Sequence, residues 1–229
     1  MLKQAIETGR NEATRGFSSP VQKPARQALA DSFAMMGAHF HVAKNAEIYG
    51  EGEPAEYVYK VATGVVRTCK LLSDGRRQIS SFFLPGDIFG LEATVDHRFT
   101  AEAVSDVTLV FVKRSALTAL AGRDGDVANE LWSAATAELR STQEHVLLLG
   151  RKSAQERLAA FLLEMVERTN GGEAVDLPMS RLDIADYLGL TIETVSRTIT
   201  VLENAQTISL PSTRRIRLRD KAALTRLNA

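Results

Sequence analysis

The chain has 229 residues, of which 28 are basic and 28 acidic, so its zero net charge gives no overall sign of a nucleic-acid partner. A hydrophobic content of 45% excludes a largely disordered protein. The single cysteine, Cys69, excludes an internal disulfide and a cysteine-held zinc or iron–sulfur centre. No run of about 18 apolar residues could span a membrane, and the N-terminus is too polar for a secretory signal. We therefore expect a soluble, cytoplasmic protein of one or two domains with no membrane partner.

The chain begins with a predicted flexible tail, residues 1–28, and continues into a β-rich part, residues 29–124. The tail mixes charged residues with glycine, serine and proline. The β-rich part contains short runs of Val, Phe, Tyr and Thr, with turn residues about every 8–12 positions. Gly75 follows Ser73 and Asp74 and tolerates the positive φ that hairpin turns need. This texture is typical of a β-sandwich or barrel.

Residues 125–150 are predicted to form one long helix, because no proline or glycine occurs between Asp126 and Gly150. Apolar and small side chains recur along it at spacings of three and four residues: Leu131, Ala135, Leu139, Thr142, Val146 and Leu149. So narrow a stripe is typical of a coiled-coil seam. We expect a dimer interface here, and packing of the helix on its own domain is the alternative.

Residues 151–229 are predicted to form a winged helix-turn-helix domain. Its first helix has a broad apolar face, made by Leu158, Phe161, Leu162 and Met165. Further along, Ser180 and Asp183 have the spacing of a capping box. Gly189 then breaks the helix, and Thr191 is placed to cap the next one. A helix, a short turn with glycine and a second helix are the signature of a helix-turn-helix.

The second helix of this motif has two different faces. Its apolar residues fall within about 60° of one another: Val195, Ile199 and Leu202. Glu193, Ser196, Arg197 and Thr200 lie on roughly the opposite side. Arginine can bond guanine bidentately and glutamate can accept from cytosine, so Glu193, Ser196 and Arg197 are predicted to read bases in a major groove. The alternative is an ordinary salt bridge between Glu193 and Arg197, which are four residues apart.

After this helix, two β-like runs around Pro211, Ser212 and Thr213 predict a hairpin, the wing. Arg214 and Arg215 would lie near DNA phosphates, where contacts fix register and carry no sequence information. The stretch from residue 205 to 229 is locally basic, which supports a phosphate-contacting edge, although a solvated surface would look the same.

Taken in order, these motifs resemble the cyclic-AMP receptor protein and fumarate–nitrate regulator family over nearly the whole chain. The β-rich part shows that family's glycine frame, residues 148–163 are similar to its segment after the dimer helix, and Glu193, Ser196 and Arg197 match its recognition helix. Residues 188–197 and 208–220 look most like the FixK branch. The resemblance implies an α+β fold: a β-roll (double-stranded jelly roll), a long dimerisation helix and a C-terminal winged helix-turn-helix.

The resemblance also implies a bacterial transcription activator that binds double-stranded DNA as a homodimer and works with RNA polymerase. The operator would be two-fold symmetric with TTGA half-sites: Arg197 would read the guanine, Glu193 the bases paired opposite and Ser196 a thymine. Ile192 stands where the cyclic-AMP branch has a second arginine, which favours TTGA. By the same resemblance, three residues would touch phosphates: Ser180, Thr191 and Thr194.

Departures from the family pattern concern the effector. Leu91 follows Gly90 where the cyclic-AMP branch has glutamate, and residues 97–100 lack its Arg-Ser or Arg-Thr pair. A buried phosphate would be poorly stabilised without those partners. We therefore expect no cofactor, no metal and no cyclic-AMP switch. FixK-like proteins are generally active without a co-effector, under an upstream oxygen-responsive system.

Several alternatives stay open. The DNA binding could be gated by an unidentified ligand or by a redox change at Cys69, which lies in a predicted strand. Four histidines occur, but nothing selects one of them as a haem ligand. A metal-dependent cupin-like enzyme is faintly suggested by His39, His41 and Glu47, but no substrate machinery accompanies them. We expect no enzyme and no catalytic residue.

Overall fold

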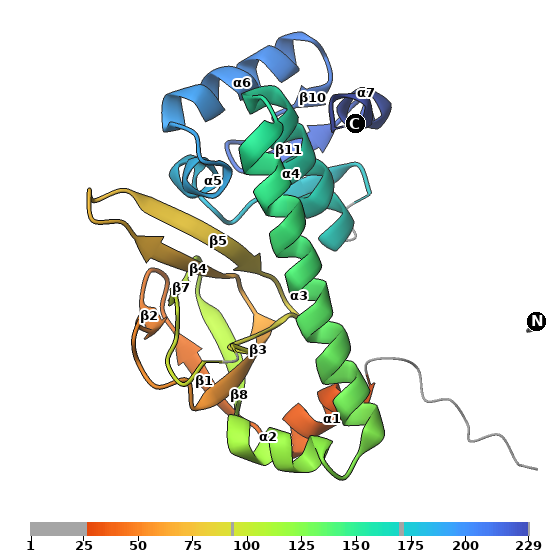
Figure 1. The fold of residues 1–229 in the computed structure, drawn as a ribbon. Helices are drawn as coiled ribbons and strands as arrows, with labels where there is room; N and C mark the ends of the chain where they lie inside the picture. The colour runs from red at the N-terminus through yellow and green to blue at the C-terminus, as the bar shows by residue number, and fades with distance from the viewer. Residues whose placement is uncertain (1–26, 93, 170–171, 229) are drawn as a thin grey trace, which may run out of the picture.

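A computed structural model describes residues 27–92, 94–169 and 172–228 (Figure 1). The predicted flexible tail lies outside these ranges except for its last two residues, which open helix α1 (Gln27–Met36). The α+β architecture expected from the sequence is confirmed: a β-roll, a long helix and a C-terminal helical domain with a small sheet follow one another along the chain. No helix of the described residues has the length and apolarity needed to cross a bilayer.

The β-roll consists of two four-stranded antiparallel sheets, with strand orders β1-β8-β3-β6 and β2-β7-β4-β5. Its strands are β1 (Ala38–Val42), β2 (Glu47–Tyr49), β3 (Tyr57–Thr63), β4 (Val66–Leu71), β5 (Arg77–Phe83), β6 (Ile88–Phe89), β7 (Thr100–Ala103) and β8 (Val107–Lys113). The predicted hairpin joins β4 to β5, and Gly75 in its turn has φ +84°. Val61, Val66, Ala101 and Leu109 are fully buried between the two sheets.

Helix α2 (Arg114–Ala121) leads from the β-roll into α3 (Gly125–Arg151), which runs along the β-roll toward the C-terminal domain (Figure 1). With 27 residues, α3 is about 40 Å long. The side chain of Asp124 accepts hydrogen bonds from the backbone at the helix start. The helix ends at Arg151, because Ser153 and Glu156 form a capping box that starts the next helix; the end predicted at Gly150 was one residue early.

The C-terminal domain is a winged helix-turn-helix. Its elements are α4 (Ala154–Arg168), β9 (Ala174–Asp176), α5 (Arg181–Leu188), α6 (Ile192–Asn204), β10 (Ile208–Ser209), β11 (Arg215–Leu218) and α7 (Lys221–Asn228). Strands β10 and β11 form the wing predicted from the sequence. Strand β9 was not predicted; it pairs antiparallel with β11 and completes a three-stranded sheet.

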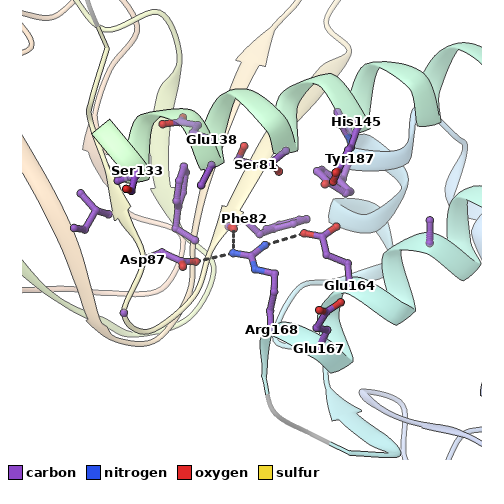
Figure 2. A pocket seen from close by; sticks show the side chains of 18 of the residues that line it. Ser81, Phe82, Asp87, Ser133, Glu138, His145, Glu164, Glu167, Arg168 and Tyr187 are labelled. Carbon is purple, nitrogen blue, oxygen red and sulfur yellow. Dashed lines mark hydrogen bonds and ion pairs between the residues drawn. The ribbon is translucent and has the colours of Figure 1, made fainter. Parts of the chain in front are cut away.

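The β-roll and the C-terminal domain share one hydrophobic cluster. Phe82 of β5 lies against Phe161 of α4 and Tyr187 of α5, with ring centroids 6.3 and 5.2 Å apart. Beside these rings, Arg168 of α4 crosses to the β-roll, where its guanidinium donates to the Phe82 carbonyl at 2.8 Å and to Asp87 at 2.6 Å (Figure 2). The two domains are therefore held by apolar and polar contacts at once.

Candidate nucleic-acid interface

Helix α6 divides into the two faces that the sequence predicts. Val195, Ile199 and Leu202 are at most 3% exposed and belong to the core of the C-terminal domain. Because a helix turns 100° per residue, burying these three forces the opposite face outward. Glu193 and Arg197 are exposed on it. The structure therefore presents an acceptor and a guanidinium to solvent on one helix surface.

Ser196, the third predicted base-reading residue, lies between these two faces. It is half-buried, and its hydroxyl accepts a hydrogen bond of 3.3 Å from the guanidinium of Arg181 at the start of α5. Sequence analysis missed Arg181, because the fifteen-residue separation of the two positions falls outside any helical spacing. The hydroxyl keeps its other bonding capacity for a ligand.

The electrostatics of Glu193 differ from those of a simple surface salt bridge. The pKa of Glu193 lies below its ordinary value, because its carboxylate accepts hydrogen bonds from its own backbone N–H and from Thr191, with a smaller attraction to Arg197. Among the described residues, the structure records no ion pair between Glu193 and Arg197 within 4.0 Å. Both side chains therefore remain available to an external partner.

The turn between α5 and α6 has the geometry of a helix-turn-helix. Ser180 and Asp183 form the predicted capping box at the start of α5. Gly189 ends α5 with φ +60°, a conformation that costs other L-residues free energy. Thr191 caps α6 by accepting a hydrogen bond from the backbone of Thr194 at 3.2 Å. These local bonds fix where α6 begins.

The residues predicted to touch phosphates lie in two groups. Ser180 and Thr191 are exposed and Thr194 is half-buried, at the helix starts. The hydroxyl of Ser180 already donates to Asp183 at 2.8 Å. Arg214 and Arg215 form the exposed end of the wing. The Nε atom of Arg215 lies 4.0 Å from the Oδ1 atom of Asp176, which is a long ion pair. The wing therefore presents two exposed positive charges near α6.

The stripe on α3 is largely uncovered within the chain. Leu139 and Val146 are 57% and 62% exposed. Leu131 is half-buried and packs against the cluster formed by α1, α2 and β8, so it contributes little to a free surface. Trp132, which the sequence analysis did not select, is 73% exposed and falls on the same helix face as Leu139 and Val146. The exposed seam thus begins at Trp132.

The described residues of the β-roll do not fit the phosphate of a cyclic nucleotide. His97 is buried, stacks on Tyr49 with ring centroids 3.5 Å apart, and has its Nδ1 atom 3.2 Å from Glu92. Arg98, the nearby arginine, is exposed. The Glu92 carboxylate would repel a phosphate in this place. Among the described residues, Arg114 is the arginine paired with Glu92, at 3.8 Å.

The side chains considered for redox or metal chemistry, Cys69, His39 and His41, lie on two different strands of the β-roll. Cys69 is buried in β4, and burial, together with the nearby Glu102 carboxylate, raises the pKa of its thiol to about 11. Across the described parts of the chain, no three His, Cys, Asp or Glu side chains come together in a way that could hold a metal ion. His39 and His41 lie on the edge strand β1, where His41 contacts Thr108.

Comparisons with known proteins account for both domains. Residues 39–124 match the family described as "Cyclic nucleotide-binding domain", and residues 156–227 match "Crp-like helix-turn-helix domain". The "Nitrogen fixation regulation protein FixK" of Azorhizobium caulinodans is 56% identical over 205 residues, which are 87% of this chain and 83% of the relative. "Transcriptional activatory protein AadR" of Rhodopseudomonas palustris is 40% identical over 182 residues, 78% of this chain and 76% of that protein.

A solved structure agrees with these relatives. The structure of FixK2 from Bradyrhizobium japonicum is similar with a TM-score of 0.82 at 52% sequence identity, covering 85% of this chain and 98% of that one. The relatives that match are regulators rather than enzymes.

The environment of Cys69 generates a testable prediction. Because a thiol with a pKa of about 11 is ionised only to roughly one part in several thousand at pH 7.5, alkylation of the folded protein should be at least about tenfold slower than that of the unfolded chain. The alkylation rate should rise steadily as the pH approaches 11. Mass spectrometry after timed iodoacetamide treatment, with and without guanidinium chloride, measures both rates. Equal rates in the two states would contradict a buried, protonated thiol.

Proposed function

This chain belongs to the cyclic-AMP receptor protein and fumarate–nitrate regulator family, within its FixK branch, and we propose that it activates transcription as a homodimer on a two-fold symmetric operator with TTGA half-sites. It is a DNA-binding transcription regulator by that membership. The observation that carries the operator proposal is the exposed face of α6, with Glu193 and Arg197 facing solvent and Ser196 between them.

Each residue on this face has a proposed base. Arg197 bonds the O6 and N7 atoms of the guanine in TTGA, because a guanidinium fits that pair bidentately. Glu193 meets the bases paired opposite, where its ionised carboxylate accepts from cytosine N4, and its lowered pKa keeps it ionised. Ser196 contacts a thymine. Ile192 offers no guanidinium at the helix start, which favours TTGA over a half-site with a further guanine.

Phosphate contacts would hold the C-terminal domains of both subunits on the DNA duplex. Arg214 and Arg215 approach the backbone from the wing, and Ser180, Thr191 and Thr194 approach it from the helix starts, where backbone N–H groups favour an anion. Such contacts supply affinity and register, whereas the α6 side chains supply specificity.

Dimerisation would occur along α3. The exposed side chains Leu139 and Val146, together with Ala135 and Thr142, form a seam of coiled-coil width, and Leu149 continues it toward the C-terminal domain. Two parallel α3 helices would set two α6 helices about one turn of DNA apart, roughly 34–36 Å, which matches a palindrome.

We further propose that the protein binds DNA without a small-molecule co-effector and that it takes part in low-oxygen gene control together with RNA polymerase. The absence of a fit for a nucleotide phosphate around Glu92 and His97 supports the first part. The second part follows from likeness to a relative named for regulation of nitrogen fixation.

A ligand-gated protein is the competing proposal, and one observation favours it. A cavity of about 860 Å³ lies between α3, α4 and the β-roll, and Glu138, His145, Glu164 and Arg168 are among its lining residues (Figure 2). Selection of bound sequences from a random DNA pool by protein purified without additives separates the two proposals. Recovery of TTGA palindromes supports co-effector independence, whereas failure to bind until an extract is added supports a ligand.

The base assignment is tested by Arg197→Ala. Loss of the bidentate bond should weaken operator binding by about 1–3 kcal/mol and abolish the preference for guanine at that position of the half-site. Competition binding with duplexes substituted at the guanine measures both effects. Arg123→Ala is the control, because Arg123 is exposed in the turn between α2 and α3, far from α6 along the chain, and carries the same charge. An unchanged base preference in the Arg197 variant would remove that residue from the reading surface.

The wing assignment is tested by the double substitution of Arg214 and Arg215 by Ala. Binding should weaken by a similar factor on all sequences. Because each of the two subunits loses two arginines, the slope of log K against log salt should flatten by up to about 3.6, or about 0.9 per lost phosphate contact. Titrations at four salt concentrations on operator and scrambled duplexes give the slopes. A change in base preference at constant slope would contradict the phosphate role.

The dimer seam is tested by Leu139→Glu. Leu139 is exposed in the single chain, so the subunit should fold, but a charge in the seam should raise the dimer dissociation constant by about a hundredfold. Leu147→Glu is the matched control: Leu147 is 64% exposed and lies about 100° away from the seam on the same helix. Sedimentation of both variants over a range of concentrations measures their dimer dissociation constants. Equal association of the two variants would place the interface elsewhere.

A further inference from the structure

Two arginines of the β-roll form ion pairs with the first helix of the helix-turn-helix. Arg67 of β4 donates from Nη1 to the Oδ1 atom of Asp183 at 2.8 Å, and Arg77 of β5 donates from Nη2 to the same oxygen at 2.7 Å. Arg77 also donates from Nε to Asp186 at 2.8 Å, and Arg67 from Nε to Glu102 at 2.8 Å. We call these five residues the interdomain ionic cluster. It joins positions more than 100 residues apart.

Asp183 has two functions in this cluster. Its Oδ2 atom accepts from the backbone N–H of Ser180 at 2.9 Å and from the Ser180 hydroxyl at 2.8 Å, which completes the capping box of α5. Its Oδ1 atom receives both arginines. Although burial opposes ionisation, the hydrogen bonds of Ser180 and the charges of Arg67 and Arg77 hold the pKa of Asp183 below its ordinary value. One ionised carboxylate thus ties the start of α5 to the β-roll.

The cluster is buried enough to restrict geometry. Asp183 and Arg67 are 5% and 7% exposed, so their hydrogen bonds are largely shielded from bulk solvent. Buried ion pairs often add little net stability over apolar residues of the same size. Their hydrogen bonds, however, weaken steeply beyond about 3.2 Å or when bent. The apolar contact of Phe82 with Tyr187 tolerates sliding, whereas the ionic cluster accepts one arrangement of α5 on the hairpin.

The orientation of α5 is passed on to α6 by direct contacts. Arg181, two residues before Asp183, bonds the hydroxyl of Ser196 on α6 at 3.3 Å. The backbone N–H of Leu190 bonds the carbonyl of Ala185, so the turn between the helices is fixed as well. A displacement of α5 on the β-roll would therefore move the base-reading face with it.

We propose that Arg67 and Arg77 are positioning residues for DNA reading: through Asp183 and Asp186 they hold α5, and with it α6, in the DNA-binding orientation without a small molecule. The inference rests on the proposed function of the α6 face. It assigns to two β-roll side chains the role that an effector would otherwise have in setting the position of the C-terminal domain.

Arg77 offers the sharper test, because its neighbour Arg76 is a matched control. Arg76 lies on the same hairpin, its side chain is 77% exposed, and within the described part of the chain its ion-pair partner is Asp74 of that hairpin alone. R76Q and R77Q remove the same charge at adjacent positions, but only R77Q removes bonds to α5. Operator binding by the full-length protein, followed by fluorescence anisotropy on a TTGA palindrome, should weaken by about tenfold for R77Q and stay within about twofold of wild type for R76Q.

D186N separates two explanations, positioning of α5 and long-range charge attraction, because they predict opposite changes in DNA affinity. Removing a negative charge from a DNA-binding protein should strengthen binding if only long-range attraction matters. If Asp186 helps to position α5, D186N should weaken binding as R77Q does, and the double variant R77Q/D186N should lose much less than the product of the two single effects. The salt slope should stay at the wild-type value in all three, because none of these residues touches a phosphate.

Four results would overturn the inference: equal affinities of R76Q and R77Q, stronger binding by D186N, a salt slope that flattens by about 1.8 in R77Q (about 0.9 for each subunit of the dimer), or a lowered melting temperature of R77Q with full operator affinity. R67Q is measured alongside, with its melting temperature, because Arg67 is buried and its loss could unfold the chain. Failure of the proposed function would be distinct, since wild type would then not prefer the TTGA palindrome over a scrambled duplex. The variant series would in that case be compared on the sequence that wild type selects from a random pool.

Discussion

The packing of β5 on the C-terminal domain is the contact on which the position of the DNA-reading surface depends. Phe82 packs against both Phe161 and Tyr187, so the core of the C-terminal domain extends into the β-roll instead of closing on itself. Apolar contacts of this kind supply free energy roughly in proportion to the area that they bury, but little direction. The relative orientation of the two domains is fixed by the polar contacts on either side of these rings. These are the contact of Arg168 with Asp87 and the contacts of the arginines of β4 and β5 with α5.

A second consequence of this packing is that the two sides of α6 carry different kinds of side chain. The side of α6 that faces the shared core is apolar at all but one position, so the charged residues of the helix lie on the outer surface. Thr198 is the exception, and its buried hydroxyl is satisfied by the carbonyl of Thr194 at 2.8 Å. The side chains that we propose as base readers are therefore exposed because of what the opposite face buries, before any DNA is present.

The helix-turn-helix could be predicted from the sequence because its signals are local. The capping box at Ser180, the break at Gly189 and the cap at Thr191 all lie within a dozen residues, and each fixes backbone conformation by bonds to near neighbours. The hairpin at Gly75 was predictable for the same reason. By contrast, the three residues of β9 carry too short a pattern to be recognised, and this strand exists only because β11 lies beside it.

Features that depend on distant contacts could not be predicted. The choice between Leu131 and Trp132 as the start of the exposed seam depends on which side of α3 the α1 and α2 helices cover, and adjacent helical residues give no hint of that. The interdomain ionic cluster joins residues separated by 116 positions, and the sequence marks Asp183 only as a capping-box residue and gives no sign of its pairing with Arg67. Their burial is a property of the assembled domains alone.

The zero net charge of the chain is compatible with DNA binding because charges act locally. At physiological ionic strength, exposed charges separated by more than about 8–10 Å are largely screened from one another. Acidic side chains such as Glu138, Glu144 and Glu164 line the cavity between α3 and the domains, whereas Arg214 and Arg215 lie at the end of the wing. A phosphate at the wing would therefore meet the positive charge of Arg214 and Arg215, opposed locally by Asp176 but not by the acidic side chains of the cavity. The arginines of the interdomain ionic cluster act on Asp183 and Asp186 instead of on DNA for a different reason: ion pairs within hydrogen-bond distance already neutralise their charge.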